Sequence, residues 1–397
     1  MLVQFMLKNV LSFKEETILD MTAINAYKEH QCNLIDSETK EKYLRVAAIY
    51  GANASGKSNI YMAMTYFQRI IAESLNNVED GEATAIRTYY QPFSFDNEKE
   101  NSEFQIVQIL GNFEYKYGFE YNSNCIVTEW LYRKNLQTKR NSTVFERTTG
   151  KVEFGPCVRK ECEVYKEQIP VETLVLTFFN KLKLKSDTFK TVYSGVMDTL
   201  VVPTDFCEDT RLLEALLPQL IDEEKSALVD FLSAIDTGIK DIDYDDSEKE
   251  VKFTAYHKGK DDKLYPLNLF FESEGTIKSI MLFIYARTAI LYDKSIFVDE
   301  LNIKLHPLLL KFIIDLFYEN ESQAQLIYTT HDTTLLDKKF FRRDQIWFVQ
   351  KDEFGYSELS ALSDFKVRSD ASFERDYLAG VYGGIPWLKE FCMKEGK

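Results

Sequence analysis

A run of eight residues near the start of the chain has the composition of a loop that binds phosphate groups. It reads Gly51-Ala52-Asn53-Ala54-Ser55-Gly56-Lys57-Ser58 and is followed by Asn59. The two glycines permit a tight loop whose backbone N–H groups point inward at a phosphate. Lys57 can reach the β- and γ-phosphates of ATP, and the Ser58 hydroxyl is placed for Mg²⁺. The pattern therefore predicts an ATP and Mg²⁺ site at residues 51–59, with Lys57 also acting in catalysis.

The residues on either side of this loop predict the strand and the helix that it requires. Val46 to Tyr50 is a short apolar run that ends directly at Gly51, and apolar residues recur at helical spacing after Ser58. Phosphate groups would then lie at the positive end of a helix dipole. A degenerate loop that binds nothing is the alternative, and the order strand, loop, helix argues against it.

A second apolar run, Ile296 to Val298, ends in the adjacent acids Asp299 and Glu300. Asp299 would hold Mg²⁺, directly or through water, and Glu300 would polarise the water that attacks the γ-phosphate. Two acids at the end of a strand could also be plain surface residues. The phosphate loop upstream favours the catalytic interpretation.

Two further segments add polar residues to the same chemistry. The apolar strand Gln325 to Tyr328 leads to His331, which we interpret as a catalytic sensor of the γ-phosphate because ligands of doubly wound sheets bind at this edge. Ser273 and Gly275 begin an apolar helix shortly before the acidic pair. A structural histidine and a plain helix N-cap are the simpler readings of these two features.

Taken in their order along the chain, these four motifs resemble the Walker A, signature, Walker B and switch-histidine motifs of ABC-type ATPase heads, which include the SMC and OLD families. The chain resembles in particular bacterial AAA-type ATPases of the RloA and AbiL sort, found in phage-defence and abortive-infection loci. Four other stretches carry this likeness, namely residues 5–13, Leu301 to Pro307, Arg343 to Phe348 and Tyr382 to Pro386. Residues from about 155 to 240 carry little of it.

The resemblance implies an α/β fold with a phosphate loop on a mixed sheet, an antiparallel β lobe and a helical insertion. It also implies a homodimer that sandwiches ATP, in which Ser273 and Gly275 contact the γ-phosphate held by the second subunit. Residues 301–306 would cross the dimer interface. Glu274 departs from the glycine common in transporter signatures, which puts the strength of that contact in doubt. Gln91 is the candidate Q-loop residue that binds the metal, with a strand-edge residue as the alternative.

The pattern along the chain divides it into three parts. Residues 1–155 would form the N-terminal part of the ATPase head with the β lobe, 156–240 a helical insertion, and 241–397 the C-terminal part of the head. The insertion sustains no long heptad pattern, so an SMC-type coiled-coil arm is not expected. In the short stretch after His331 we do not expect the TOPRIM nuclease domain that OLD-family proteins carry.

Composition limits the choice of partners. The chain has 48 basic and 63 acidic residues and a net charge of −15, which disfavours a broad surface that coats nucleic acid. Local basic candidates remain at Arg133-Lys134 with Lys139-Arg140, and at Lys181, Lys183, Lys185 and Lys190, although solvated surface is the simpler reading.

No apolar run is long enough to span a membrane and no secretory signal is recognisable, so a cytoplasmic protein is expected. The cysteines, at Cys32, Cys125, Cys157, Cys162, Cys207 and Cys392, lack zinc-site spacing and are expected to be reduced.

Three functions are compatible with these features. The favoured one is an ATP-driven sensor or scaffold for anti-phage defence that acts with a separate effector protein of the nuclease or TOPRIM type. The second is an SMC-like ATPase for DNA repair or tethering, disfavoured by the missing coiled coil and the acidic charge. The third is a self-contained toxic enzyme, for which the helical insertion offers no catalytic constellation.

Overall fold

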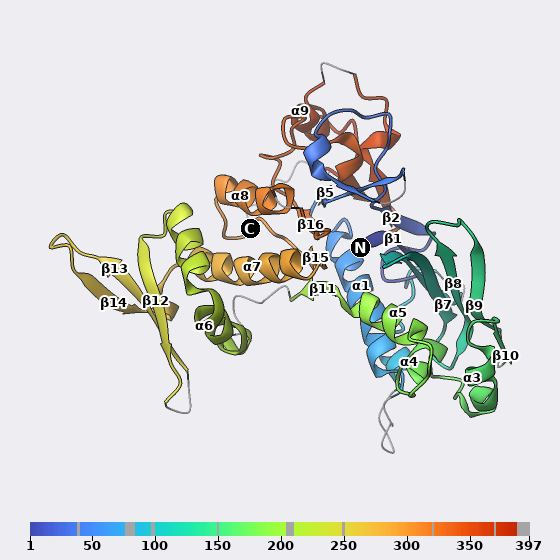
Figure 1. The fold of residues 1–397 in the computed structure, drawn as a ribbon. Helices are drawn as coiled ribbons and strands as arrows, with labels where there is room; N and C mark the ends of the chain where they lie inside the picture. Colours follow the sequence, from blue (N-terminus) through green and yellow to red (C-terminus); the bar gives the residue numbers. More distant parts are fainter. Residues whose placement is uncertain are drawn as a thin grey trace, which may run out of the picture.

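The computed structural model describes residues 1–37, 40–75, 84–96, 100–148, 151–203, 210–247, 251–319, 321–368 and 371–386. Within these ranges the strands form two large and two small sheets (Figure 1). Cys207 and Cys392 lie outside the described ranges. Free thiols are found at Cys32, Cys125, Cys157 and Cys162.

A six-stranded sheet forms the centre of the molecule, with the strand order β11-β15-β16-β5-β17-β18. Its strands are β11 (Thr199–Val202), β15 (Ser295–Val298), β16 (Gln325–Thr330), β5 (Val46–Gly51), β17 (Ile346–Lys351) and β18 (Ser357–Ala361). All neighbours pair in parallel except β17 and β18. Every residue of β5, β15 and β16 is buried, as expected for parallel strands covered on both faces.

A seven-stranded antiparallel sheet forms a lobe beside the central sheet, in the order β10-β9-β8-β7-β6-β1-β2. Its strands are β1 (Leu2–Lys8), β2 (Thr17–Asp20), β6 (Ser102–Leu110), β7 (Phe113–Tyr121), β8 (Ile126–Asn135), β9 (Asn141–Thr148) and β10 (Lys151–Phe154). Helix α1 (Lys57–Glu73) packs against this lobe through Phe67, whose ring lies 5.6 Å from that of Phe104 and 5.7 Å from that of Phe119. The helix that follows the phosphate loop is thereby fixed by an aromatic core.

Residues 156–240 are mostly helical, as the sequence predicts. They contain α3 (Arg159–Cys162), α4 (Val175–Asn180), α5 (Thr188–Met197) and α6 (Thr210–Ala234). The same segment also supplies β11, the edge strand of the central sheet, which the sequence analysis did not anticipate because a run of four apolar or β-branched residues is too short to show a period. Lys181, Lys183 and Lys185 lie in an irregular exposed stretch after α4 rather than on a helix.

The C-terminal part carries two more helices of the core and a small sheet. Helices α7 (Glu274–Leu291) and α8 (Pro307–Tyr318) flank the strands that end at the acidic pair and at the histidine. The three-stranded sheet, β12 (Ile239–Asp245), β13 (Lys252–Lys258) and β14 (Leu264–Asn268), extends away from α6 and α7 (Figure 1). The expected boundary at residue 240 therefore falls inside β12.

The remaining strands and α-helices of the described ranges are short: β3 (Leu34–Asp36), β4 (Lys42–Leu44), α2 (Ala85–Thr88) and α9 (Phe373–Leu378). The predicted α/β fold class is confirmed, since the phosphate loop follows a strand of a mixed sheet that lies beside an antiparallel β lobe. None of the helices described is both long and apolar enough to cross a membrane.

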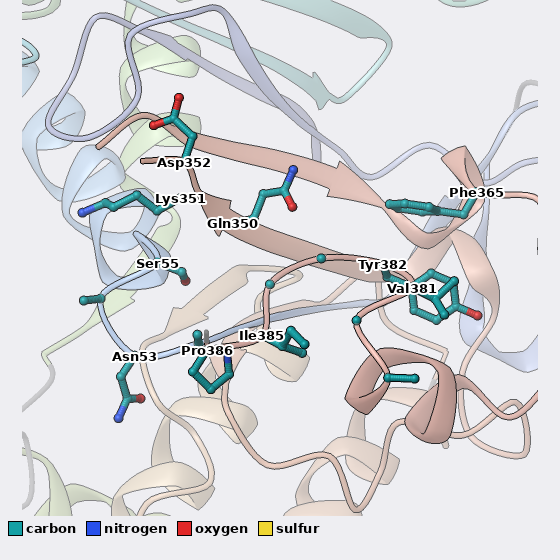
Figure 2. Close-up of a pocket in the computed structure, with 16 residues that line it drawn as sticks. Asn53, Ser55, Gln350, Lys351, Asp352, Phe365, Val381, Tyr382, Ile385 and Pro386 are labelled. Carbon is teal, nitrogen blue, oxygen red and sulfur yellow. The ribbon is translucent and has the colours of Figure 1, made fainter. Parts of the chain in front are cut away.

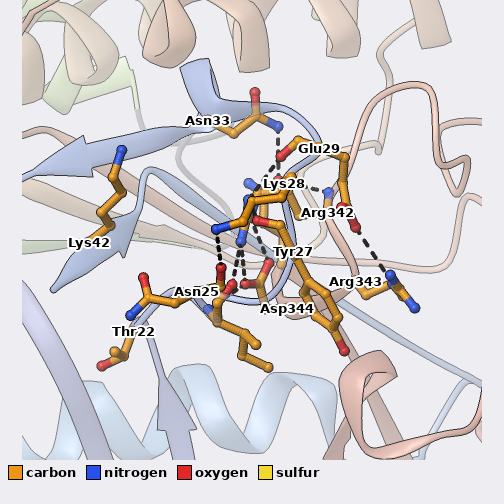
Figure 3. Close-up of polar contacts among 12 residues, drawn as sticks. Thr22, Asn25, Tyr27, Lys28, Glu29, Asn33, Lys42, Arg342, Arg343 and Asp344 are labelled. Atoms are coloured by element: carbon orange, nitrogen blue, oxygen red, sulfur yellow. Dashed lines mark hydrogen bonds and ion pairs between the residues drawn. The ribbon is translucent and has the colours of Figure 1, made fainter.

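A buried arginine joins the N-terminal segment before β3 to the C-terminal part of the chain (Figure 3). Arg342 is fully buried and pairs with Asp344 at 2.8 Å. Its guanidinium also donates to the carbonyl oxygens of Ile24, Tyr27 and Glu29. Close by, the amide of Gln345 donates to the carbonyl of Val46, the first residue of β5. This network fixes where the strand that leads to the phosphate loop begins.

Candidate nucleotide site

The loop between β5 and α1 is closely packed at both of its glycines. Gly56 has a φ of +114°, a conformation that favours glycine. A Cβ on Gly56 would lie 2.4 Å from the hydroxyl oxygen of Ser357, and a Cβ on Gly51 would lie 2.6 Å from the carbonyl oxygen of Val349. Neither position has room for a larger residue, so both glycines of the motif are required by the surrounding structure.

Lys57 lies over this loop at the first position of α1. Its side chain is largely buried, and Nζ donates to the carbonyl oxygens of Gly51 at 2.8 Å and Ala52 at 2.9 Å. Burial lowers the pKa of Lys57, while the nearby carboxylates of Glu300 and Asp299 oppose this effect. A bound triphosphate would offer the same ammonium stronger, negatively charged acceptors.

Ser55 supplies an independent sign that the loop is built to hold a ligand. Its side chain is only 4% exposed, and Oγ is buried without a hydrogen-bond partner. A buried hydroxyl without a partner costs free energy, which a ligand oxygen would relieve. The residues of the loop thus fit a phosphate group.

Two serines that the sequence analysis did not single out support the loop from outside. The hydroxyl oxygens of Ser12 and Ser357 are 2.7 Å apart, and that of Ser357 is also 2.7 Å from the carbonyl oxygen of Ser55. Asn59, expected to bind nucleotide, donates its amide to Ser12 at 2.6 Å. Single polar residues far from the motif in sequence, one before it and one after it, carry no pattern by which a sequence could reveal this contact.

The acidic pair follows β15 and is held by a threonine on the neighbouring strand β16. The Thr329 hydroxyl accepts from the backbone N–H of Glu300 at 2.7 Å and donates to a carboxylate oxygen of Asp299. Glu300 has a φ of +48°, an uncommon conformation for a residue with a side chain. Lys278 on α7 donates to the carbonyl oxygen of Glu300 at 3.3 Å. Thr329 and Lys278 are therefore positioning residues, a role that the sequence analysis assigned to neither.

His331 follows β16 at the same edge of the sheet. Its Nε2 lies 3.4 Å from the amide nitrogen of Asn302, and the Asn302 carbonyl oxygen accepts from the Thr330 hydroxyl at 2.8 Å. Because β15, β16 and β5 are adjacent parallel strands, their carboxyl ends lie side by side. The structure thus brings the acidic pair, the histidine and the phosphate loop to one edge, with Ser58 half-buried at the start of α1.

The expected signature residues, Ser273 and Gly275, lie beside the 301–306 segment. Ser273 caps α7 by accepting from the backbone N–H of Thr276 at 3.1 Å and is exposed. A Cβ on Gly275 would lie 2.7 Å from the carbonyl oxygen of Lys304. Glu274, the departure from the transporter pattern, pairs with the Lys304 ammonium at 3.0 Å. The signature residues and the 301–306 segment therefore pack against each other and belong to one surface.

Gln91 lies in an irregular segment between α2 and β6 with its side chain exposed. Its backbone carbonyl accepts from the N–H of Leu11 at 2.7 Å, next to Ser12. The role of its side chain as a metal ligand stays a prediction. Within the described ranges, no group of three or more His, Cys, Asp and Glu side chains could hold a metal by itself. A Mg²⁺ site of the predicted kind needs fewer, because phosphate oxygens and water complete it.

A family model described as "AAA domain, putative AbiEii toxin, Type IV TA system" matches residues 46–157 and 204–337. No curated protein matches the chain. Among solved structures, the SMC head domain from Thermotoga maritima is 13% identical at a TM-score of 0.43, covering 91% of this chain and 98% of that one. An SMC head bound to the C-winged helix domain of ScpA is 13% identical at a TM-score of 0.42, covering 95% and 99%. TM-scores below 0.5 establish no shared function.

Proposed function

The chain belongs to this AAA-domain family, and we propose that it binds ATP with Mg²⁺ and hydrolyses the γ-phosphate at the edge of the central sheet. One relationship carries the proposal. The ammonium of Lys57 is held over the phosphate loop by the carbonyl oxygen of Gly51. The negative charges of Glu300 and Asp299, which follow a strand two places away in the sheet, favour its protonated form. A cation and two carboxylates so arranged meet the needs of phosphoryl transfer, which depends on positioning and charge.

Each side chain has a distinct role in the proposed reaction. Lys57 exchanges its carbonyl partners for β- and γ-phosphate oxygens. Ser58 and Asp299 would hold Mg²⁺, which neutralises the charge that develops on the phosphate groups. Glu300 accepts a proton from water as the water oxygen bonds to the γ-phosphorus and the bond to ADP breaks.

Two further residues complete the mechanism. His331 would contact the γ-phosphate from the neighbouring strand. Thr329 fixes the backbone of Glu300 and the carboxylate of Asp299, so it acts through both acids rather than on the substrate.

Titration of the purified chain with ATP and Mg²⁺, followed by measurement of phosphate release, tests this function. Lys57→Ala is expected to weaken ATP binding by at least about 100-fold, because the buried site then holds a polyanion with backbone dipoles alone. Lys190→Ala, an exposed lysine on α5, is the matched control and should bind like wild type. Near-normal affinity of Lys57→Ala would contradict the assignment of the phosphate loop.

The biological role that we propose is an ATP-driven sensor or scaffold for abortive infection that acts through a separate effector. The family description supports this role, since it names a toxin and a type IV toxin–antitoxin system. The surface that carries Ser273, Gly275 and the 301–306 segment is proposed as the interface of an ATP-dependent homodimer. Ser273, Lys304 and His306 are exposed on it. Co-purification of the chain with the product of the neighbouring reading frame, with and without ATP, tests for the effector. Equal recovery in both nucleotide states would argue against ATP-controlled partnership.

A further inference from the structure

A cavity of about 890 Å³ opens beside the phosphate loop, and none of the roles predicted from the sequence accounts for it. Its walls come from three separated segments: Ala52–Ser55 of the loop, Gln350–Asp352 at the end of β17, and Ala379–Pro386 near the C-terminus. Figure 2 shows the C-terminal segment running opposite the loop. We propose that this cavity receives the nucleoside end of the bound nucleotide. The inference rests on the proposed function.

The order of the central strands places the nucleoside on this side. The acidic pair follows β15 and His331 follows β16, both on one side of β5, so the γ-phosphate end of a nucleotide points in that direction. Strand β17 lies on the other side of β5. A triphosphate that spans the loop therefore leads its ribose and base away from Glu300 and toward the end of β17, where Gln350 begins the cavity wall.

The C-terminal wall presents bare backbone toward this space. Gly380, Gly383 and Gly384 all have positive φ values, of +80°, +70° and +67°. A Cβ on Gly383 would lie 2.0 Å from the side-chain oxygen of Gln350 at the end of β17, and the positive φ of Gly383 is a backbone conformation that favours glycine. The Tyr377 hydroxyl anchors the segment by donating to the carbonyl oxygen of Gly384 at 2.9 Å.

The lining combines apolar and polar groups as a nucleoside requires. Val381, Ile385 and Phe365 offer apolar surface to a planar base (Figure 2). Gln350, whose amide nitrogen donates to Glu358 at 3.1 Å, offers its amide oxygen. Ser55, whose buried hydroxyl lacks a partner, lines the same cavity and is within the loop that would hold the phosphates. The volume lies within the range of about 300 to 1,000 Å³ that is usual for small-molecule sites.

Filling the cavity separates the nucleoside from the phosphates experimentally. Val381 is 58% exposed and lines the cavity, whereas Val171 is 56% exposed and lies outside it. We expect Val381→Trp to weaken ATP binding by at least tenfold while the affinity for inorganic tripolyphosphate stays unchanged. Val171→Trp should change neither affinity. An unchanged ATP affinity in Val381→Trp, or an equal loss of both ligands, would overturn the proposal.

A second measurement locates the base without a substitution. Wild-type protein is photolabelled with 8-azido-ATP and digested with trypsin, which releases residues 376–389 as one peptide. Label in this peptide, or in the peptides that contain the other two walls at residues 52–55 and 350–352, supports the cavity. Label confined to any other part of the chain overturns it. Failure of the proposed ATPase function looks different, because wild-type protein would then bind neither ATP nor tripolyphosphate.

Discussion

Ser12 and Ser357 are 345 positions apart in the chain, yet their hydroxyl oxygens are 2.7 Å apart beside the phosphate loop. The backbone N–H of Ser357 also donates to the carbonyl oxygen of Ser12 at 2.8 Å. One serine follows β1 of the antiparallel lobe and the other begins β18 of the central sheet. Both would collide with any side chain larger than that of Gly56. Three parts of the molecule therefore set the conformation of the loop together.

Removing one hydroxyl of this contact tests its importance. Ser357→Ala leaves the Ser55 carbonyl without its side-chain donor, and we expect a loss of about 1 to 3 kcal/mol in unfolding free energy. ATP affinity should fall several-fold, because the loop is less well ordered before binding. Ser360→Ala, on the same strand, is the control. Urea unfolding and ATP titration are the measurements, and identical values for both variants would show that the contact is dispensable.

Binding and catalysis are expected to separate at the acidic pair. Glu300→Gln should keep ATP and Mg²⁺ binding but lower hydrolysis by orders of magnitude, so that an ATP-bound dimer accumulates in sedimentation. Hydrolysis at the parental rate would remove Glu300 as the catalytic carboxylate.

Thr329→Val retains the shape of the side chain but removes both contacts to the pair. It should lower kcat about 10- to 100-fold with little change in KM, as positioning residues do. If KM rises while kcat is unchanged, Thr329 acts in binding instead.

The sequence predicted those parts of the site that lie at the ends of buried strands. Gly51, Asp299 and His331 each end or follow a continuous apolar run, and parallel pairing brings such ends together. Ser12, Ser357 and Thr329 were missed because each is one ordinary polar residue whose partner is fixed by tertiary structure alone. Strand β11 was missed because four residues show no period. The cavity depends on the positive φ values at its glycines, which no pattern of apolar residues encodes.

Arg342 is expected to be among the most important residues for stability. Arg342→Ala leaves the buried carboxylate of Asp344 without its positively charged partner and frees three backbone carbonyls, which should cost about 3 to 5 kcal/mol. Arg343→Ala removes a half-buried side chain that stacks 4.2 Å from the ring centre of Tyr27, and should cost about 1 kcal/mol or less. Chemical unfolding compares the two. Equal losses would mean that burial of Arg342 does not decide its contribution.

Glu129 on β8 is a fully buried acid that joins the antiparallel lobe to α4. Its carboxylate accepts from the backbone N–H groups of Val175 and Leu176 and from the Tyr117 hydroxyl, with the Arg147 guanidinium 3.9 Å away. Burial raises the pKa of Glu129 to about 7, and the positive charge of Arg147 and these hydrogen bonds only partly offset the effect. Between pH 4.5 and about 7, the folded chain therefore keeps a proton on Glu129 that the unfolded chain has lost.

This raised pKa predicts that stability falls as pH rises. Between the unfolded pKa near 4.5 and the folded pKa near 7, the folded state binds more protons than the unfolded state, so unfolding free energy decreases with pH. The contribution of Glu129 is fully present below the unfolded pKa and is lost as pH rises through the folded pKa. The slope should approach about 1.4 kcal/mol per pH unit within that window.

Glu129→Gln cannot titrate and should flatten this part of the profile, even though it also lowers stability at every pH by opposing one N–H donor. Glu146→Gln, on the exposed end of a contact with Tyr132, is the control and should keep the slope. Urea unfolding from pH 5 to 8 measures all three proteins, and an unaltered slope in Glu129→Gln would assign the pH dependence to another group.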